Sequence, residues 1–352
     1  FGSIYASATI FSSLLLIWVG KKIDDYRILN YSFFVVILLF TSSLFFSFIN
    51  SVYFLAIGIF LMRFSGQGLM SHTSTTTISR FFERSRGKAL STIWFGLSTA
   101  EFILPVLITY FFLIYSWRTV WQGIAVLIIL FLPFVILNTI KSIKLDSREV
   151  DPSPDNKKLK IKSWRRRDVL KDFKFYMYLP LSLLMSFTVT GFLFHQVYIA
   201  EIKSWTLINL AQGFIFYAVS GITGSIISGI LIDKLTGRKL IPFHLLPMLA
   251  IFIVMLFSDH VYVLYLYMAG LGLSNGFTEN ISNSLWAEMY GVKNLGSIKA
   301  LLTFFGIMAS ASSPFLYGII LDQTSSTNTL IYLSLILIIL FSLMGYFSKK
   351  LK

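Results

Sequence analysis

The sequence predicts an all-α membrane protein made of two similar multi-helix halves. Three observations support this prediction: a very apolar composition, a series of long apolar runs, and a polar motif that recurs at a fixed distance along the chain. Of the 352 residues, 56% are hydrophobic and only 13% are charged, whereas about a quarter of the residues in a soluble domain are charged. With a mean hydropathy of +0.75, the chain suits a lipid bilayer rather than water.

Long apolar runs divide the chain into eleven predicted transmembrane helices. A span needs roughly 20 apolar residues. Backbone groups in hydrocarbon must bond to one another, and these runs are continuously apolar instead of alternating, so we expect helices rather than β-strands. The expected helices cover residues 2–19, 31–48, 52–79, 89–112, 119–139, 176–200, 207–231, 241–257, 261–286, 298–320 and 328–347.

Charge in the loops predicts how the chain is oriented. If the loop at 20–30 is cytoplasmic and the loops alternate from there, cytoplasmic segments hold 27 of the 30 Lys and Arg residues. Exterior segments hold Arg118 and Lys203, and Arg63 lies inside a span. This asymmetry is the positive-inside pattern. It explains the net charge of +14 without nucleic acid, and it predicts a cytoplasmic C-terminus. We expect a multi-pass protein of the plasma (inner) membrane.

A polar stretch at residues 140–174 separates a first half, residues 1–139, from a second half, residues 175–352. Its proline, serine and charged residues predict a cytoplasmic linker. Its basic residues fit an orientation signal that also touches anionic lipid. A regulatory or protein-binding role is the alternative.

A repeat relates the two halves. Gly20 and Asp24 recur as Gly229 and Asp233, 209 residues further on. The same offset links Gly87 to Gly296 and Pro105 to Pro314. Residue 1 then corresponds to residue 210, and the helix at 176–200 lies before that point. We therefore expect a twelfth helix before residue 1, with a genuine eleven-helix protein as the alternative.

Several classes of chemistry are absent from the sequence. The chain has no cysteine, which excludes disulfides and thiolate metal sites. It also has no P-loop, no nucleophile elbow and no His-Glu-x-x-His motif. We therefore expect no enzyme, no cofactor and no metal site. Separately, we expect a monomer whose partners are the bilayer and a small-molecule substrate.

The recurring motif resembles the signature of the major facilitator superfamily, and the resemblance covers nearly the whole chain. The fuller copy comprises Gly229, Asp233, Gly237, Arg238 and Lys239. The first copy keeps Gly20, Asp24 and Arg27 but lacks the later Gly-Arg-Lys. The resemblance implies two six-helix halves that rock about a central cavity. It also implies a complete latch in the second half and a weaker latch in the first.

The physical role of this motif follows from its residue types. Glycine lets neighbouring helices approach closely. An aspartate at the cytoplasmic mouth can accept hydrogen bonds from a nearby helix N-terminus or pair with basic loop residues. Such contacts can form in one gate state and break in the other. The alternative is an ordinary turn with solvated charges.

A second cluster lies within the spans. Arg63 and Gln67, in the stretch Arg-Phe-Ser-Gly-Gln-Gly, resemble the fourth-helix motif of the same superfamily. A charged group at mid-depth is costly and should face a cavity or a partner. Glu101 reaches a similar depth on the next helix, so we expect the two to pair. Either Arg63 binds an anionic substrate group while Glu101 carries the coupling proton, or the pair is structural.

Three further polar residues are candidates for substrate or proton coupling. His195 lies in the helix that opens the second half and is either a packing residue or a proton sensor. Glu279 is a membrane carboxylate or an interfacial side chain. His72, with Ser71 and residues 73–77, forms a polar patch that lines the inner vestibule or bonds its own helix backbone.

The loop containing Arg84, Arg86 and Gly87 resembles that of the monocarboxylate and oxalate/formate exchanger branch. Together these residues predict a secondary active transporter of a small solute, an organic anion such as a carboxylate, driven by a proton gradient or by exchange. Efflux of an amphipathic compound is the alternative within transport. A non-transporting membrane receptor or scaffold is the alternative from another class.

Overall fold

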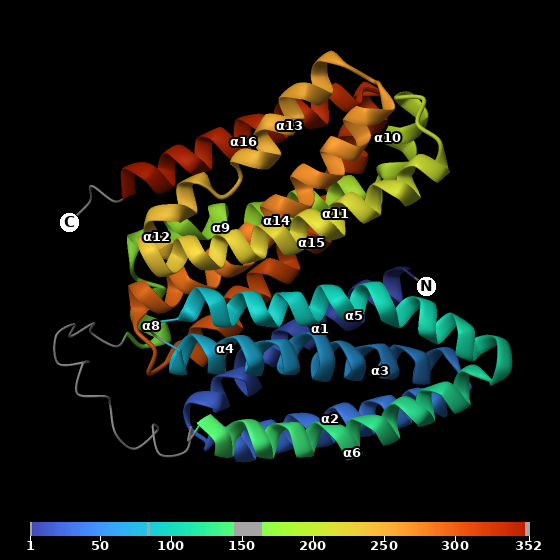
Figure 1. Cartoon of the computed structure of the whole chain (residues 1–352), viewed down its shortest axis with the longest axis vertical. Helices are drawn as coiled ribbons and strands as arrows, with labels where there is room; N and C mark the ends of the chain where they lie inside the picture. Colours follow the sequence, from blue (N-terminus) through green and yellow to red (C-terminus); the bar gives the residue numbers. More distant parts are fainter. Residues whose placement is uncertain (1, 83–84, 144–163, 349–352) are drawn as a thin grey trace. The chain divides into compact units, whose positions relative to one another are not determined.

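The computed structural model of the chain describes residues 2–82, 85–143 and 164–348. Within these ranges a few side chains, those of Glu101 and Pro105 among them, are not described. Every regular element in the described residues is a helix, as Figure 1 shows, and these residues contain no β-strand. The predicted all-α class is therefore confirmed.

The helices follow the apolar runs closely. Their bounds are α1 Gly2–Val19, η1 Gly20–Asp24, α2 Ile28–Ser47, α3 Val52–Met62, η2 Arg63–Met70, α4 Ser71–Phe81, α5 Arg86–Ile114, α6 Trp117–Ile143, α8 Arg166–Val169, α9 Phe173–Phe194, α10 Gln196–Ile202, α11 Leu207–Leu235, α12 Gly237–Leu240, η4 Ile241–Phe243, α13 Leu246–Phe257, α14 Val261–Tyr290, α15 Leu295–Thr324 and α16 Thr327–Ser348.

Eight helices in the described residues are long and apolar enough to cross a membrane. The other three predicted spans correspond to α1, α5 and α14, which are helical over 18, 29 and 30 residues. The count of eleven spans stays a prediction. The middle of the predicted linker falls outside the described residues, and its end forms the short helix α8.

Three predicted helices are interrupted, which is a correction to the sequence-based bounds. The helix at 52–79 widens into a π-helix over Arg63–Met70. The helix at 176–200 breaks at His195, between α9 and α10. The run at 241–257 begins with a 3₁₀ turn before α13. Hydropathy misses such breaks because it measures the apolar character of a segment and not its hydrogen-bond pattern.

Polar residues fix where several helices start. The Ser51 side chain accepts a hydrogen bond from the backbone N–H of Phe54 and begins α3. Thr206 and Asn209 form a reciprocal capping box at the start of α11. These caps satisfy backbone N–H groups that the first helical turn leaves without partners.

The described chain forms two compact units, each assembled from separate segments. The first unit comprises residues 1–83, 100–166 and 290–304. Within it α2 packs along α6, and α1 packs against α3 and η2. Buried side chains such as Leu16, Val35 and Leu69 form part of its core.

The second unit comprises residues 84–99, 167–289 and 305–352. Within it α16 packs along α9 and α13. Its core is aromatic: the Phe192 ring lies 4.8 Å from that of Phe252 and 5.5 Å from that of Tyr317, centroid to centroid. The predicted division into halves at 1–139, 140–174 and 175–352 remains a prediction.

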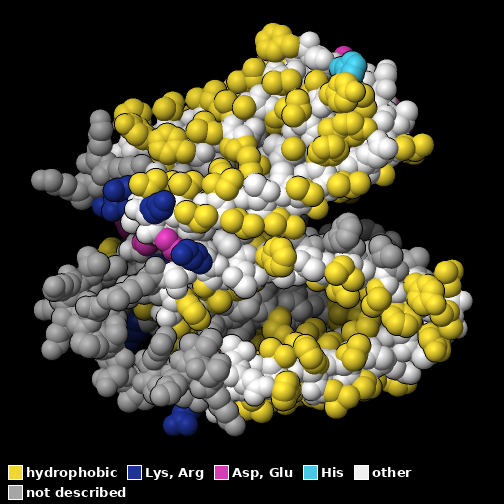
Figure 2. Space-filling model, viewed as in Figure 1, with side chains coloured by type: hydrophobic (Ala, Val, Ile, Leu, Met, Phe, Trp, Pro, Cys, Tyr) yellow, Lys and Arg dark blue, Asp and Glu magenta, His cyan; other side chains and the backbone are white. Residues whose placement is uncertain are grey.

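The surface of the described residues is unusually apolar. Large hydrophobic side chains such as Phe131, Leu130 and Ile208 are more than 60% exposed. Figure 2 shows hydrophobic side chains over much of the viewed face and few charged ones. A soluble monomer rarely exposes so much contiguous apolar surface, so the surface is that of a protein surrounded by lipid.

Candidate functional site

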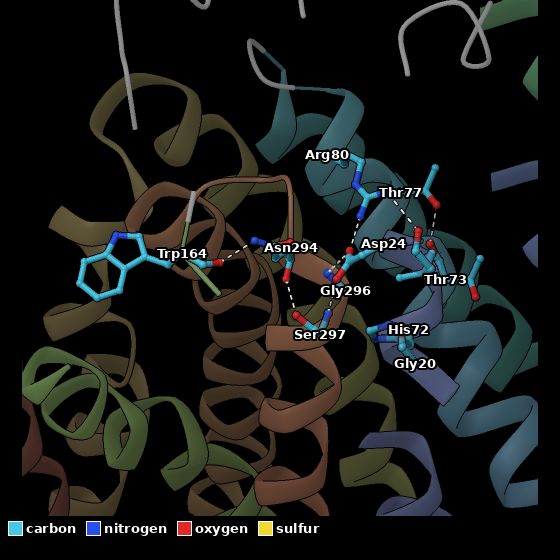
Figure 3. A network of polar contacts seen from close by, with 11 residues as sticks. Gly20, Asp24, His72, Thr73, Thr77, Arg80, Trp164, Asn294, Gly296 and Ser297 are labelled. Carbon is cyan, nitrogen blue, oxygen red and sulfur yellow. Dashed lines mark hydrogen bonds and ion pairs between the residues drawn. The ribbon is translucent and has the colours of Figure 1, made fainter. Parts of the chain in front are cut away.

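Asp24 is the centre of a compact polar cluster in the first unit. Its two carboxylate oxygens accept hydrogen bonds from the backbone N–H groups of Gly296 and Ser297, at 2.9 and 2.7 Å. Arg80, at the end of α4, forms an ion pair with the same carboxylate and also donates to the Ile23 carbonyl. Figure 3 shows these groups converging at the start of α15. We call this cluster the first latch.

The environment of Asp24 explains why its partners are needed. The side chain is only 5% exposed. Burial raises the pKa of Asp24 above its ordinary value, while the Arg80 charge and the two backbone N–H groups act in the opposite direction. A helix N-terminus carries a partial positive charge, so the first turn of α15 is a suitable partner for a buried carboxylate.

Other groups extend the first latch along α4. Nε2 of the buried His72 lies 3.0 Å from the Gly20 carbonyl oxygen. The buried Lys299 ammonium, on α15, donates to the Thr75 carbonyl and to the Ser79 hydroxyl, both at 2.9 Å. These contacts attach α4 to η1 and to α15 through polar groups that are excluded from solvent.

Asp233 makes the corresponding contact in the second unit. One of its carboxylate oxygens accepts a hydrogen bond from the backbone N–H of Gly87, at 3.0 Å, near the start of α5. The helices meet closely here, because a Cβ on Gly87 would lie 2.1 Å from the Gly229 carbonyl oxygen. We call the Asp233–Gly87 contact the second latch.

A cluster of buried polar side chains, which we call the Asn280 hub, lies one helical turn beyond the second latch along α5. The side-chain amide of Asn280, on α14, is within 3.1 Å of the Ser91 hydroxyl on α5 and of the hydroxyls of Ser225 and Ser228 on α11. It also donates to the Ser225 carbonyl. Asn280 is fully buried, so this hub joins three helices in a solvent-excluded environment.

The relative completeness of the two latches differs from the sequence-based expectation. The first copy of the motif, which lacks the later Gly-Arg-Lys, has the fuller set of contacts. Among the described residues, the buried Asp24 has two backbone donors and an arginine, whereas the exposed Asp233 has one backbone donor. The sequence argument failed because it compared only the residues within the two motif copies, whereas the partners of Asp24 lie outside the motif, on α4 and α15.

The additional motif residues of the second copy have a different partner. Glu288, on α14, accepts hydrogen bonds from the backbone N–H groups of Gly237 and Arg238, at 2.8 and 3.0 Å. Lys239 follows them on α12 and is exposed, as is Arg27 in the loop before α2. Glu288 therefore caps α12, the short helix that the second half of the motif forms.

The end of the linker is held in the first unit. The backbone N–H of Trp164 donates to the Tyr290 carbonyl, and the Asn294 side chain donates to the Trp164 carbonyl at 2.9 Å. Arg166 donates to the Ile17 carbonyl, also at 2.9 Å. The end of the linker is thus held beside the loop that precedes α15, as Figure 3 shows for Trp164 and Asn294.

Arg63 and Gln67 lie together at the centre of a predicted span. Both belong to the π-helix η2, and the Arg63 side chain donates a hydrogen bond to the Gln67 side-chain oxygen. The guanidinium carbon lies 4.3 Å from the centroid of the Tyr5 ring, on α1. Single π-helical turns within α-helices occur frequently at functional sites. The sequence singled out Arg63 and Gln67 as members of one motif, but it predicted Glu101 as the partner of Arg63 and did not point to Gln67 or Tyr5 in that role.

The remaining candidates are placed as follows. The Glu101 side chain lies outside the described residues, so the predicted pairing of Arg63 with Glu101 stays a prediction. Arg84 also lies outside the described residues. Arg86 is buried at the start of α5. Nε2 of His195 lies 2.9 Å from the Pro314 carbonyl oxygen. Glu279 is half-buried on α14.

The polar patch on α4 faces inward. His72, Thr73, Thr75 and Thr76 are all buried. The hydroxyls of Thr73 and Thr75 donate to carbonyls four residues earlier in the chain, at 2.6 and 3.0 Å. Of the two expected arrangements, these threonines therefore adopt the one in which they bond their own helix backbone.

The apolar surface, the long helices and the paired contacts of Asp24 and Asp233 define a multi-pass integral membrane protein with a repeated structure. The family model of the Major Facilitator Superfamily matches residues 1–314. The chain belongs to that superfamily and is a transporter rather than an enzyme. A search of curated protein sequences finds no match.

Solved structures of similar fold are transporters of the same architecture. A bacterial homologue of the iron transporter ferroportin in its outward-facing state has a TM-score of 0.69 and 16% identity, covering 99% of this chain and 90% of that one. A bacterial homologue of ferroportin in the outward-facing state with soaked iron has a TM-score of 0.71 and 18% identity, covering 99% of this chain and 89% of that one. A variant of the E. coli fucose:proton symporter gives 0.68 and 11%, over 98% and 90%.

Proposed function

We propose that this transporter moves a small organic anion, such as a carboxylate, by alternating access driven by a proton gradient or by exchange. The observation that carries the proposal is Arg63. It is a partly exposed cation on a π-helical turn inside a predicted span. Charged groups in spans are rare, and by default they mark a substrate or ion pathway.

The chemistry of the guanidinium supports an anionic substrate. It carries five N–H donors in a planar arrangement that matches a carboxylate. Gln67 accepts one hydrogen bond, and the Tyr5 ring lies against the guanidinium face. These contacts orient the Arg63 side chain, so it loses less conformational entropy when it binds an anion.

Proton coupling is proposed for Glu101, the membrane carboxylate on the helix after Arg63. His72, His195 and Glu279 are retained as further candidates for substrate or proton coupling. The likeness of the loop containing Arg86 to the monocarboxylate branch favours a carboxylate. The solved neighbours are a homologue of an iron transporter and a fucose:proton symporter, so fold alone does not select a substrate.

Gating is proposed for the two latches. In this proposal their contacts hold the cytoplasmic ends of α5 and α15 in one state and separate in the other. The orientation comes from the loop charges, which place the latches and the C-terminus on the cytoplasmic side of the plasma membrane. The outward-facing state of the ferroportin homologue makes alternating access a reasonable expectation for a chain of this fold.

The test is uptake of radiolabelled carboxylates into proteoliposomes with and without a pH gradient. We expect Arg63→Gln to abolish uptake and Arg63→Lys to retain part of it. Lys88→Gln, which removes an exposed charge at the start of α5, is the matched control. Glu101→Gln should lose proton-driven accumulation but retain exchange of internal for external substrate.

Two results would contradict the proposal. Carboxylate uptake in Arg63→Gln equal to that in the Lys88→Gln control would remove Arg63 from the binding site. Accumulation driven by the pH gradient in Glu101→Gln would remove Glu101 from the coupling step.

A further inference from the structure

We propose that an apolar groove between α1 and α3 receives the hydrophobic part of the transported anion while Arg63 binds its charged end. This inference rests on the proposed function and narrows the substrate class. The substrate would be an amphipathic monoanion, a carboxylate attached to an aromatic or branched apolar group, rather than a small polar acid.

The groove belongs entirely to the first unit and has a volume of about 570 Å³. Ala8 and Phe11 of α1 line one side, and Ala56 and Phe60 of α3 line the other. Ser7 is the one polar residue among the lining residues. Sites for small ligands typically measure about 300 to 1,000 Å³ and are mostly apolar with a few polar groups, so the groove has a suitable size and chemistry.

Arg63 and Tyr5 do not line the groove, but each lies close in sequence to a residue that does. Phe60 lines the groove, and Arg63 follows it by three residues, which places the two side chains on neighbouring positions of one helix surface. On α1, the lining residue Ile4 precedes Tyr5, whose ring lies against the guanidinium. The groove and the contact between Arg63 and Tyr5 therefore both lie between α1 and the continuous span formed by α3 and η2.

This arrangement separates two kinds of recognition. The edge of the Arg63 guanidinium offers paired N–H donors to a carboxylate. The groove offers apolar surface, and removing apolar surface of a ligand from water favours binding in proportion to the area buried. Acetate would use only the first contribution, whereas a phenyl-substituted carboxylate would use both.

The aliphatic chain of a membrane lipid is the alternative occupant of such a groove. Charge complementarity favours the anion, because the contacts of Arg63 among the described side chains are with the neutral Gln67 and Tyr5, and a lipid tail would add no negative charge. The two occupants predict different results when the groove is filled.

The test measures binding of 4-phenylbutyrate and acetate to the full chain in nanodiscs, by isothermal titration calorimetry, with empty nanodiscs as the blank. We expect the wild type to bind 4-phenylbutyrate at least about tenfold more tightly than acetate, a difference that corresponds to about 1.4 kcal/mol. Ala56→Leu, which narrows the groove, should remove most of this preference and leave acetate affinity unchanged. Ala211→Leu, at an exposed position on α11, is the control.

A second variant keeps the test decisive if Ala56→Leu fails to fold. Phe60→Ala widens the groove and should improve binding of a bulkier naphthyl carboxylate relative to 4-phenylbutyrate. The neutral analogue 4-phenylbutanol should bind weakly to every variant, because it lacks the charge that Arg63 recognises.

The outcomes separate this inference from the proposed function. Equal affinity for both carboxylates, or a preference that Ala56→Leu and Phe60→Ala leave unchanged, would overturn the groove while leaving Arg63 as an anion site. Equal binding of 4-phenylbutanol and 4-phenylbutyrate would identify a lipid-like groove. Binding of both acids that Arg63→Gln does not weaken would overturn the proposed function itself.

Discussion

Replacing Asp24 by asparagine tests whether the first latch is the stronger of the two. The carboxylate accepts hydrogen bonds from two backbone N–H groups and pairs with Arg80. Asparagine keeps one acceptor oxygen, but its NH₂ group would face one of the two backbone N–H donors. It also removes the ion pair with Arg80. Asp233→Asn is the matched variant, because Asp233 has a single backbone donor among the described residues and is exposed.

The contacts set the size of the effect. A hydrogen bond to a charged group contributes about 1.5 to 3 kcal/mol, so we expect Asp24→Asn to weaken the first latch by about 2 to 3 kcal/mol. At about 1.4 kcal/mol for each factor of ten, this raises the open population roughly 30- to 140-fold. An exposed charge at a helix N-terminus contributes only about 0.3 to 1 kcal/mol, so Asp233→Asn should raise that population roughly two- to fivefold.

The assay uses the absence of cysteine from the chain. Thr76 is fully buried one turn after His72 on α4, and its hydroxyl has no hydrogen-bond partner among the described residues. A Thr76→Cys background therefore provides a single thiol that reacts with a maleimide only when α4 becomes accessible. The labelling rate in nanodiscs then reports the open population.

Circular dichroism and thermal unfolding of each variant provide the control for general loss of structure. Equal labelling rates in the two folded variants, or faster labelling with Asp233→Asn, would refute the ranking of the latches. A rate in Asp24→Asn equal to that of the Thr76→Cys parent would show that these contacts do not hold the latch closed.

Two further predictions concern the second unit. Gly87→Ala should abolish transport, because the new Cβ would lie 2.1 Å from the Gly229 carbonyl oxygen. Gly96→Ala, on the same helix, is the control and should be tolerated, because its Cβ would meet nothing within 4 Å. The uptake assay compares the two variants. Asn280→Ala should lower the free energy of unfolding by about 1 to 3 kcal/mol, because it leaves buried hydroxyls with fewer partners, and an unchanged melting temperature would exclude the hub as a stabilising element.

Much of the architecture could be predicted from sequence because it depends on local properties. A run of apolar residues in a bilayer must be helical whatever surrounds it, so the order and approximate bounds of the helices followed from hydropathy. The interruptions at Arg63–Met70 and His195 could not be predicted in this way. They depend on backbone hydrogen bonds that apolar composition does not encode.

Candidate site residues were predictable where the residue type was itself unusual. Arg63 was recognisable because a cation within a span is costly, and Gln67 because it belongs to the same stretch, which resembles a motif of the superfamily. Tyr5 was not, since an aromatic residue in an apolar helix has no distinguishing feature. The Asn280 hub was likewise missed as a unit, because its serines and asparagine come from three helices.

The sequence by itself determined that the chain is a helical membrane protein of the Major Facilitator Superfamily and that Asp24 and Asp233 are equivalent. Only the tertiary structure decided which aspartate is better held. The reason is that Asp24 and Gly296 are 272 residues apart, and a contact of that range depends on how helices pack. Hydropathy and motif spacing describe each segment alone, whereas the number of donors around a carboxylate is a property of the assembled fold.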